Sequence, residues 1–219
     1  MNTKVKLRVC PADAGFWMEA ILPDDCMTHL WKCIDDGKKA AITHKQELAG
    51  NISQSYTLID RDDLFTNNIL FPFIDDYSKK NGAHPHRIPA IPGKEGLTPS
   101  IKLTHMWVNY QYKHEFNPPH RHGGLYSFVV WMKVPYTFEE ECKQSFLKDT
   151  KEVEKKPGGF ELQYCDFLGN PRSTFYPMSP EMEGHMLLFP AGLTHQVFPF
   201  YSSDEPRISI SGNVWVTIE

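Results

Sequence analysis

The sequence predicts a mainly β protein with helices near its N-terminus. Three observations indicate this fold class: helical patterns are confined to the first 80 residues, a proline-rich segment follows them, and short strand-like runs recur from Ile101 onward. Such runs, separated by turn residues, are typical of a β-sandwich or barrel. A chain of 219 residues can form one large core, so we expect a single domain over 1–219, with a helical front and linker in 1–100 and the β core in 101–219.

Two helices are expected in the front part of the chain. The first should begin at Asp24 or Asp25, which can cap it, and should stop at Gly37. Its apolar residues recur at the positions i, i+3, i+4 and i+7 of one helix face: Met27, Leu30, Trp31 and Ile34. The second should run from about Asp62 to Lys80, with a kink or a new turn at Pro72, because proline breaks the helical hydrogen-bond ladder.

The linker and the core differ in composition. Residues 84–99 contain four prolines and two glycines, which predicts a loop. The charged segment 137–157 interrupts the strand pattern and is expected to be a surface insertion, either a solvated loop or a cover for a site. The strand-like runs of the core are 101–112, 125–134, 159–164, 184–189, 195–200 and 207–216.

Charge and cysteine content exclude several classes of protein. A formal net charge of −4 and a pI near 6.2 make nucleic-acid binding unlikely, because phosphate backbones need clustered Lys and Arg. There is no apolar run of the length that a membrane span requires, and the start of the chain has no signal-peptide core. The five cysteines form no CxxC pair, so we expect reduced, mostly buried thiols and a cytoplasmic protein without membrane partners.

The segment FNPPHRHGG carries the sharpest chemical signal. His120 and His122 follow two prolines that favour an extended chain, and residues i and i+2 of a strand point to the same face. Both imidazoles can therefore converge on one metal ion. A second HxH pair, His84 and His86, lies in the proline-rich loop, and nothing downstream supports it as a site.

A third histidine and an arginine strengthen this signal. His195 opens a strand after an Ala-Gly turn in LFPAGLTHQVFPF, and three protein ligands on one face leave positions for a bidentate co-substrate and O2, as in non-haem Fe(II) oxygenases. Arg207 and Ser209 share a strand face and could clamp a carboxylate. The alternative for Arg207 is an ion pair with Asp204 or Glu205 at a sheet edge.

With these motifs in place, Met106–Val216 resembles the double-stranded β-helix oxygenases that depend on 2-oxoglutarate and Fe(II), especially a poorly characterised branch found in bacteria and phages. The resemblance implies a jelly-roll of two facing antiparallel sheets and a hydroxylase of unknown primary substrate. It also assigns metal binding to His120 and His195, and 2-oxoglutarate binding to Arg207 and Ser209. Asn109 and Tyr112, on the preceding strand, could reach the co-substrate.

One position departs from the family pattern, in which an HxD or HxE pair supplies a carboxylate ligand. Here His122 stands in that position, which gives a neutral three-His set resembling that of thiol dioxygenases, which use no 2-oxoglutarate. In a different register, His122 would be the first ligand and Gly124 would leave the carboxylate position open. Three functions therefore remain: a 2-oxoglutarate oxygenase, a three-His cupin-type dioxygenase, and a non-enzymatic metal-binding jelly-roll. The other histidines are interpreted as ordinary.

Overall fold

The computed structural model describes residues 6–11, 16–45, 50–81, 99–166 and 168–218. The helices are α1 (Asp24–Ala40), α2 (Phe71–Asn81) and α3 (Phe138–Glu141), with short turns η2 (Arg61–Asp63), η3 (Thr66–Leu70), η5 (Ser145–Leu147), η6 (Glu152–Glu154) and η7 (Pro180–Met182). The strands are β1 (Lys6–Pro11), β2 (Phe16–Ile21), β3 (Gln54–Thr57), β4 (Pro99–Gln111), β5 (Asn117–His120), β6 (Tyr126–Lys133), β7 (Phe160–Cys165), β8 (Pro171–Tyr176), β9 (His185–Pro190), β10 (Thr194–Val197) and β11 (Arg207–Ile218).

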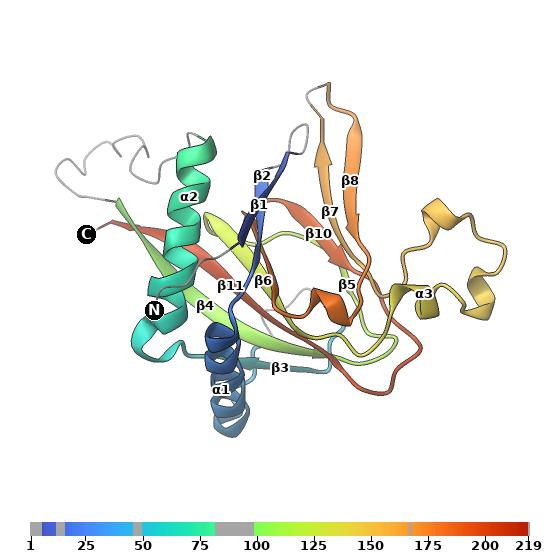
Figure 1. Ribbon diagram of the computed structural model, residues 1–219, viewed down its shortest axis with the longest axis horizontal. Coiled ribbons are helices and arrows are strands. Elements are labelled where there is room, and N and C mark those ends of the chain that lie inside the picture. The colour runs from blue at the N-terminus through green and yellow to red at the C-terminus, as the bar shows by residue number, and fades with distance from the viewer. Residues whose placement is uncertain (1–5, 12–15, 46–49, 82–98, 167, 219) are drawn as a thin grey trace.

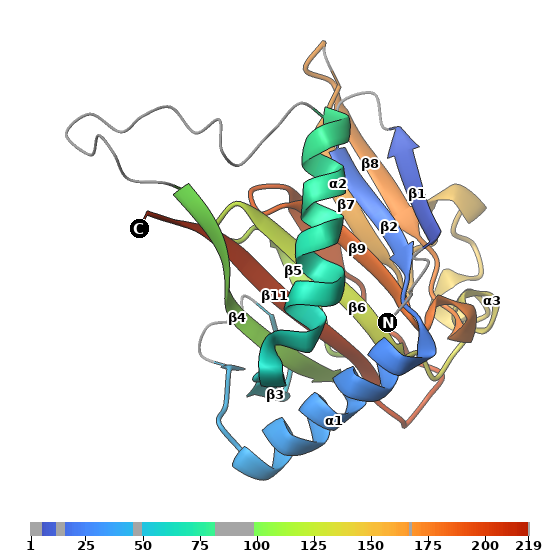
Figure 2. The same cartoon turned by 60° about the vertical axis from the view of Figure 1, so that its left-hand side comes forward.

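The described strands form two antiparallel sheets. A seven-stranded sheet has the order β1-β2-β9-β6-β11-β4-β3, and a four-stranded sheet has the order β5-β10-β7-β8. The helices α1 and α2 lie over the large sheet, and the strands β7 and β8 stand on its other side (Figure 1). After a turn of the view, α2 is seen to run across β6 and β9 (Figure 2). The expected pair of facing antiparallel sheets, with helices supplied by the front of the chain, is confirmed.

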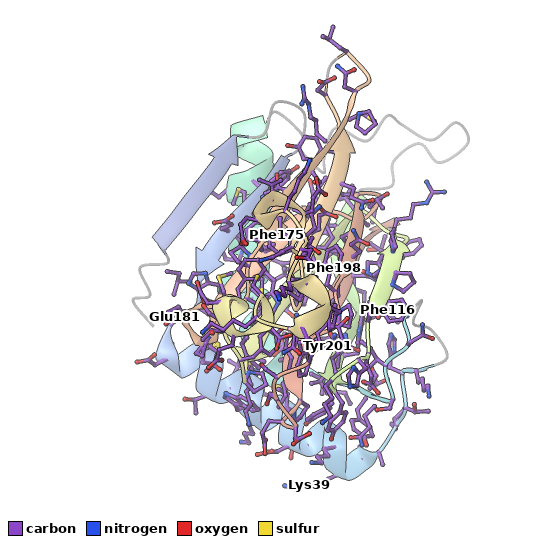
Figure 3. The ribbon with its side chains drawn as sticks, turned by 90° about the vertical axis from the view of Figure 1, so that its right-hand side faces the viewer. Lys39, Phe116, Phe175, Glu181, Phe198 and Tyr201 are labelled. Atoms are coloured by element: carbon purple, nitrogen blue, oxygen red, sulfur yellow. The ribbon has the colours of Figure 1, made fainter. Side chains whose placement is uncertain are left out.

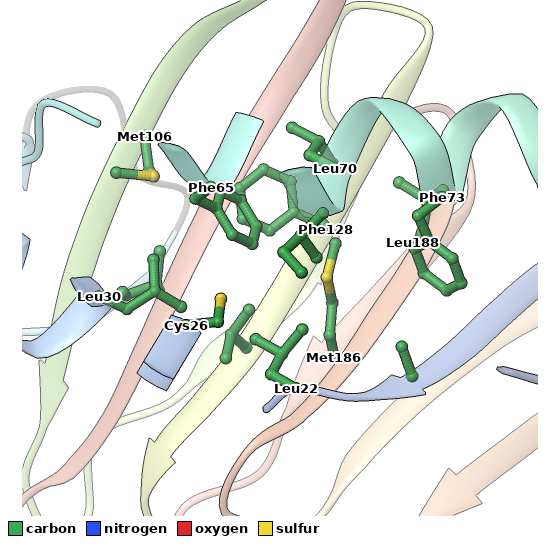
Figure 4. Packing of buried hydrophobic residues seen from close by; sticks show 14 of the residues in the cluster. Leu22, Cys26, Leu30, Phe65, Leu70, Phe73, Met106, Phe128, Met186 and Leu188 are labelled. Atoms are coloured by element: carbon green, nitrogen blue, oxygen red, sulfur yellow. The ribbon is translucent and has the colours of Figure 1, made fainter. Parts of the chain in front are cut away.

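The large sheet is buried on both faces, which explains the apolar run in β6. Phe128 and Val130 belong to the cluster that α1 and α2 cover, whereas Val129 and Trp131 belong to the cluster between the two sheets. Successive side chains of a strand point to opposite faces, so one strand contributes to both layers. Figure 4 shows the helix-side layer, where Phe65 lies beside Met106 and Phe128.

The first helix does not stop where the sequence predicted. It continues through Gly37 and ends at Ala40, and the next residue, Ala41, caps it with a left-handed backbone (φ 53°) and an N–H that donates to the Gly37 carbonyl. Gly37 instead allows a close approach, because a Cβ there would lie 2.5 Å from Leu58 Cδ2 and 2.9 Å from the Thr57 carbonyl oxygen. The glycine is therefore required for packing against the end of β3 rather than for termination.

The second helical segment has the predicted break near Pro72. A π-helical turn over Thr66–Leu70 precedes α2, and the Phe71 N–H donates to the Thr66 carbonyl. The backbone stays helical across this join, with Phe71 at φ −68° and ψ −44°, so Pro72 lies inside a continuous helical segment. The interruption predicted at Pro72 is confirmed, and it takes the form of this π-helical turn.

The front of the chain is less purely helical than predicted. It contributes β1, β2 and β3 to the large sheet, at its two edges. One further strand, β8, was not expected from the sequence pattern, whereas β5 lies in the extended segment expected before the histidine pair. β5 ends at His120, so His122 lies beyond the strand and not on its face. The predicted loop at 84–99 lies almost wholly outside the described residues, and so does the His84 and His86 pair.

The predicted surface insertion is an ordered, anchored segment. It begins with a capping box between Thr137 and Glu140, and its Glu141 carboxylate is fully buried, where it accepts bonds of 2.8 Å from the backbone N–H groups of Tyr201 and Ser202. Its aromatic residues pack on Phe175 and Tyr201, which Figure 3 labels beside α3. The insertion is thus fixed to the small sheet and the turn before β11, and it is not a loose solvated loop.

No helix in the described part of the chain is long and apolar enough to span a membrane.

Candidate active site

Three histidines converge at one end of the small sheet. His120 ends β5 and lies directly opposite His195 of β10, with ring centroids 4.2 Å apart. His122 follows β5, where its backbone N–H donates to the Ala191 carbonyl at 2.9 Å, and its ring centroid lies 5.0 Å from each of the other two. Their ligand nitrogens all lie within 4.8 Å of one another. The three side chains named from the sequence are therefore brought together.

Local backbone chemistry orients two of these rings. His120 Nδ1 lies 2.7 Å from the Pro118 carbonyl oxygen, and His195 Nδ1 lies 3.0 Å from the Leu193 carbonyl oxygen. A carbonyl can only accept, so each Nδ1 carries the proton and each Nε2 keeps a free lone pair for a metal ion. The prolines of β5 are compatible with a strand because β5 is at the edge of its sheet.

Burial keeps the triad neutral. Burial, together with repulsion from the neighbouring histidines, lowers the pKa of His195 to about 3 and that of His122 to about 4. Burial also lowers the pKa of His120, although the bond with Pro118 partly opposes that shift. Neutral imidazoles are the form that binds transition metals, so the donor set fits a divalent ion such as Fe(II).

A cavity of about 600 Å³, open to solvent, connects the histidines to the interior of the sandwich. Its lining also includes Asn109, Arg207 and Ser209, which the sequence predicted as co-substrate ligands. Asn109 and Ser209 are register partners on β4 and β11. Their side chains therefore lie next to each other on the cavity face of the large sheet.

Arg207 is a buried cation, only 3% exposed. The groups that accept hydrogen bonds from its guanidinium are all neutral. Its Nη1 donates to the Tyr136 hydroxyl at 2.8 Å and to the Gly158 carbonyl at 2.7 Å, and its Nη2 donates to Gln111 Oε1. These bonds use three of the five N–H groups of a guanidinium. Among the described residues no carboxylate pairs with Arg207. A buried charge of this kind is costly without an anionic partner, which favours a carboxylate ligand in the cavity.

The edge ion pair considered for Arg207 does not form. Asp204 pairs with Lys113, and Glu205 pairs with Lys133 at 3.0 Å. The guanidinium points inward instead.

Three buried polar atoms at the cavity lining have no hydrogen-bond partner among the described residues: Trp107 Nε1, Asn109 Oδ1 and Asn117 Oδ1. Buried polar atoms are nearly always paired in folded proteins, so unpaired ones concentrated in one cavity indicate a place for a polar ligand or water. This observation supports the cavity as a binding site independently of the histidines.

Tyr112 is not brought to this site. Asn109 and Tyr112 are three residues apart, so they point to opposite faces of the sheet, and Tyr112 packs against the helix-side cluster. Gln111, two residues after Asn109, lines the cavity instead and was missed. Tyr136 was also missed; burial raises its pKa to about 12, so its hydroxyl stays protonated and can donate to the Gly158 carbonyl at 2.7 Å.

Comparison with known proteins gives a family and a fold. A family model described as "Putative 2OG-Fe(II) oxygenase" matches residues 105–213, about half of the chain. No curated protein matches the chain in sequence.

Two solved structures are similar in fold. A prolyl-4-hydroxylase from Pseudomonas putida aligns with 91% of this chain and 92% of its own length, at a TM-score of 0.51 and 15% identity. A prolyl hydroxylase from Trichoplax adhaerens, solved with a peptide fragment of hypoxia inducible factor, aligns with 93% of this chain and 84% of its own, at a TM-score of 0.51 and 11% identity. These likenesses show the double-stranded β-helix fold. Since the family match covers the strands that carry His120, His195 and Arg207, the chain is a member of the 2OG-Fe(II) oxygenases, enzymes whose cofactors are Fe(II) and 2-oxoglutarate.

Proposed function

We propose that this oxygenase holds Fe(II) with His120, His122 and His195 and holds the distal carboxylate of 2-oxoglutarate with Arg207 and Ser209. The observation that carries the proposal is that one cavity joins three neutral imidazoles to a buried guanidinium without an acidic partner among the described residues. A ligand that chelates a metal ion and also carries a second anionic group can bind the metal at the histidines and the guanidinium at Arg207. When bound, the iron and 2-oxoglutarate activate O2 to hydroxylate a C–H bond of the substrate.

The neighbours of Arg207 support its role as a carboxylate clamp. Gln111, Tyr136 and the Gly158 carbonyl each accept from one N–H group of the guanidinium, and two N–H groups remain for a ligand. Ser209 lies two residues along the same strand face, so its hydroxyl can donate to the same carboxylate. A guanidinium fixed in advance loses little conformational entropy when it binds, which is why fixed arginines suit bidentate recognition.

The rest of the lining supports orientation of the ligand and exclusion of water. Trp107, Trp131 and Phe160 supply large apolar surfaces around the histidines. The unpaired atoms of Asn109 and Asn117 offer polar contacts that can orient a co-substrate or substrate. The cavity thus combines apolar walls with many polar side chains, which can fix the orientation of a small polar ligand.

The second candidate function is a three-His dioxygenase that does not use 2-oxoglutarate. The neutral ligand set favours it, because His122 replaces the expected carboxylate. Arg207 argues for the first function, since a metal site without an anionic co-substrate gives no reason for a buried cation beside it. The two functions differ in whether 2-oxoglutarate binds at all.

Anaerobic titration of Fe(II) in the presence and absence of 2-oxoglutarate tests the proposal. We expect a weak visible charge-transfer band that requires both ligands, that is lost in His120→Ala, and that needs at least tenfold more 2-oxoglutarate in Arg207→Lys. Arg172→Lys changes an exposed arginine of β8 and should leave the titration unchanged. Iron binding without the band would support the second function, and an unchanged band in Arg207→Lys would contradict the carboxylate clamp.

A cytoplasmic location is also proposed. The four cysteines whose side chains are described, Cys26, Cys33, Cys142 and Cys165, are all free thiols. Reduced cysteines are typical of reducing compartments. Labelling of thiols in intact cells before and after lysis would test this: modification only after lysis is expected.

A further inference from the structure

A second group of metal-binding side chains lies on the helix-covered side of the large sheet. We propose that His29 and Cys33 of α1, together with Asp60, bind a divalent transition-metal ion of the Zn²⁺ type that links α1 to the segment before α2. This site is separate from the three-His centre, which lies between the two sheets.

The side chains present the right atoms in nearly the right positions. His29 and Cys33 are four residues apart, so they share one face of α1. His29 Nε2 lies 3.5 Å from Cys33 Sγ and 2.7 Å from Asp60 Oδ1, and the three ligand atoms lie within 4.8 Å of one another. A tetrahedral Zn²⁺ ion requires about 3.6 Å between a nitrogen and a sulfur ligand and about 3.3 Å between nitrogen and oxygen. The His29–Cys33 pair already has this separation, and the His29–Asp60 pair has to open by about 0.6 Å.

Asp60 is already oriented as a ligand. Its Oδ2 accepts two bonds of 2.7 Å, from the N–H and the hydroxyl of Thr66, and its Oδ1 accepts a bond of 3.1 Å from the Phe65 N–H. The side chain is 3% exposed, against 14% for His29. Bonds of this kind, which fix a carboxylate while one oxygen faces the other ligands, are the usual outer support of a metal ligand.

Room for the ion and for a water molecule adjoins the cluster. A small cleft that opens to solvent is lined by His29, Asp25 and Cys26 of α1 and by the segment around Phe65. Two residues of this lining, Cys26 and Phe65, can be located by their labels in Figure 4. Three protein ligands and a water complete a four-coordinate site, and the cleft supplies the path by which the ion enters.

The ligand types separate this site from the active site. A thiolate, an imidazole and a carboxylate together suit Zn²⁺ or Co²⁺, and thiolate ligands give Co²⁺ an intense near-ultraviolet charge-transfer band. The three-His centre contains no sulfur, so that band reports the second site alone. The simpler interpretation of the cluster is a hydrogen-bonded His29–Asp60 pair without a metal, and it predicts no band.

Anaerobic Co²⁺ titration of the full chain tests the proposal, with a His120→Ala/His122→Ala double variant as the background that removes the active-site metal. We expect the charge-transfer band in the wild type and in the double variant, with one equivalent of Co²⁺ bound in the latter. Cys33→Ser should abolish the band in both backgrounds. Cys142→Ser removes a thiol from the insertion and should retain it. Absence of the band in the double variant, or its survival in Cys33→Ser, would overturn the proposal.

A second measurement does not depend on the thiol spectrum. Zn²⁺ at about 100 times its dissociation constant should raise the thermal unfolding midpoint of the double variant by roughly 5–10 °C, because binding to the folded state stabilises a chain of this size by that amount. His29→Gln in the same background should remove the shift while keeping the far-ultraviolet circular dichroism of the parent. An equal shift in both proteins would show that the ion binds elsewhere and would overturn the proposal.

Discussion

His195 lies directly opposite His120 in the antiparallel register of β10 and β5, and the two Nδ1 atoms face carbonyl oxygens of their own chain segments. The backbone ladder thus fixes the separation of two rings that come from positions 75 residues apart in the chain (195 − 120). His122 joins them from outside the strand and makes no comparable ring bond among the described residues. The site therefore has two strongly oriented ligands and one that is oriented less.

This difference predicts unequal effects of ligand loss. His120→Ala and His195→Ala should each weaken Fe(II) binding about 100-fold or more, whereas His122→Ala should weaken it about tenfold, because a less oriented ligand contributes less to affinity. Anaerobic metal titration measures both. His105→Ala, an exposed histidine of β4, is the matched control and should bind iron normally. Equal losses for all three ligands would contradict the inferred asymmetry.

The affinity for 2-oxoglutarate is predicted to depend on the uncharged side chain of Gln111. Its Oε1 accepts from Arg207, and its Nε2 donates to the Glu115 carbonyl at 2.6 Å. Gln111→Glu keeps the shape but places a negative charge on the guanidinium, so it should compete with the carboxylate of 2-oxoglutarate and raise its dissociation constant about 10- to 100-fold. Titration of the charge-transfer band with 2-oxoglutarate at fixed Fe(II) measures the change.

The iron affinity of Gln111→Glu separates this effect from misfolding. Fe(II) binding in the absence of 2-oxoglutarate should stay within about threefold of the wild type, because the histidines are on the small sheet and do not contact Gln111. A parallel loss of iron affinity would mean that the substitution disturbs the whole cavity.

The low pKa values of the triad predict acid sensitivity of the metal-free protein. Burial is the largest cause that lowers the pKa of His195 to about 3 and that of His122 to about 4, from the ordinary value of 6.5. As the pH falls through 6.5, the unfolded chain takes up protons that the folded state does not, so the free energy of unfolding decreases. Above 6.5 both states are neutral and the effect vanishes.

Urea denaturation of the metal-free protein at about pH 7 and about pH 5 measures this effect. The drop in midpoint should be larger for the wild type than for a His122→Ala/His195→Ala variant, which lacks the two buried imidazoles. An identical drop in both proteins would assign the acid sensitivity to other groups.

The sequence predicted the strands that alternate or stay apolar over many residues. The predicted run 207–216 lies within β11, and 125–134 extends one residue beyond β6 at each end. It did not predict β3, which has only four residues, and at β5 it predicted an extended chain but not the place of that chain at a sheet edge, where prolines are tolerated. Edge position depends on the tertiary structure, so no local pattern could show it.

Some residues of the site could be predicted from local strand periodicity, and others could not because their contacts form only in the folded chain. Arg207 and Ser209 were placed correctly on one face because strand periodicity is local. Tyr112 was placed wrongly because its odd spacing from Asn109 puts it on the other face, and the same rule would have identified Gln111. Tyr136 and Gly158 flank the insertion; they bond to each other, and both accept from the guanidinium of Arg207. That contact arises from the folded chain and left no signal in the sequence.

The last prediction concerns Gly37, where helix propensity and packing oppose each other. Alanine is favoured over glycine inside a helix by about 1 kcal/mol. The added Cβ would, however, lie 2.5 Å from Leu58 Cδ2 and 2.9 Å from the Thr57 carbonyl oxygen, and the backbone of β3 cannot yield as a flexible side chain can. We therefore expect Gly37→Ala to lower the free energy of unfolding by about 1–3 kcal/mol, since overpacking outweighs propensity.

Equilibrium denaturation in urea measures this change against a glycine with free space. A Cβ at Gly192, in the turn between β9 and β10, would meet nothing within 4 Å, so Gly192→Ala should stay within about 0.5 kcal/mol of the wild type. If Gly37→Ala were as stable as the wild type or more so, the contact with Thr57 would not limit the approach of α1 to the sheet.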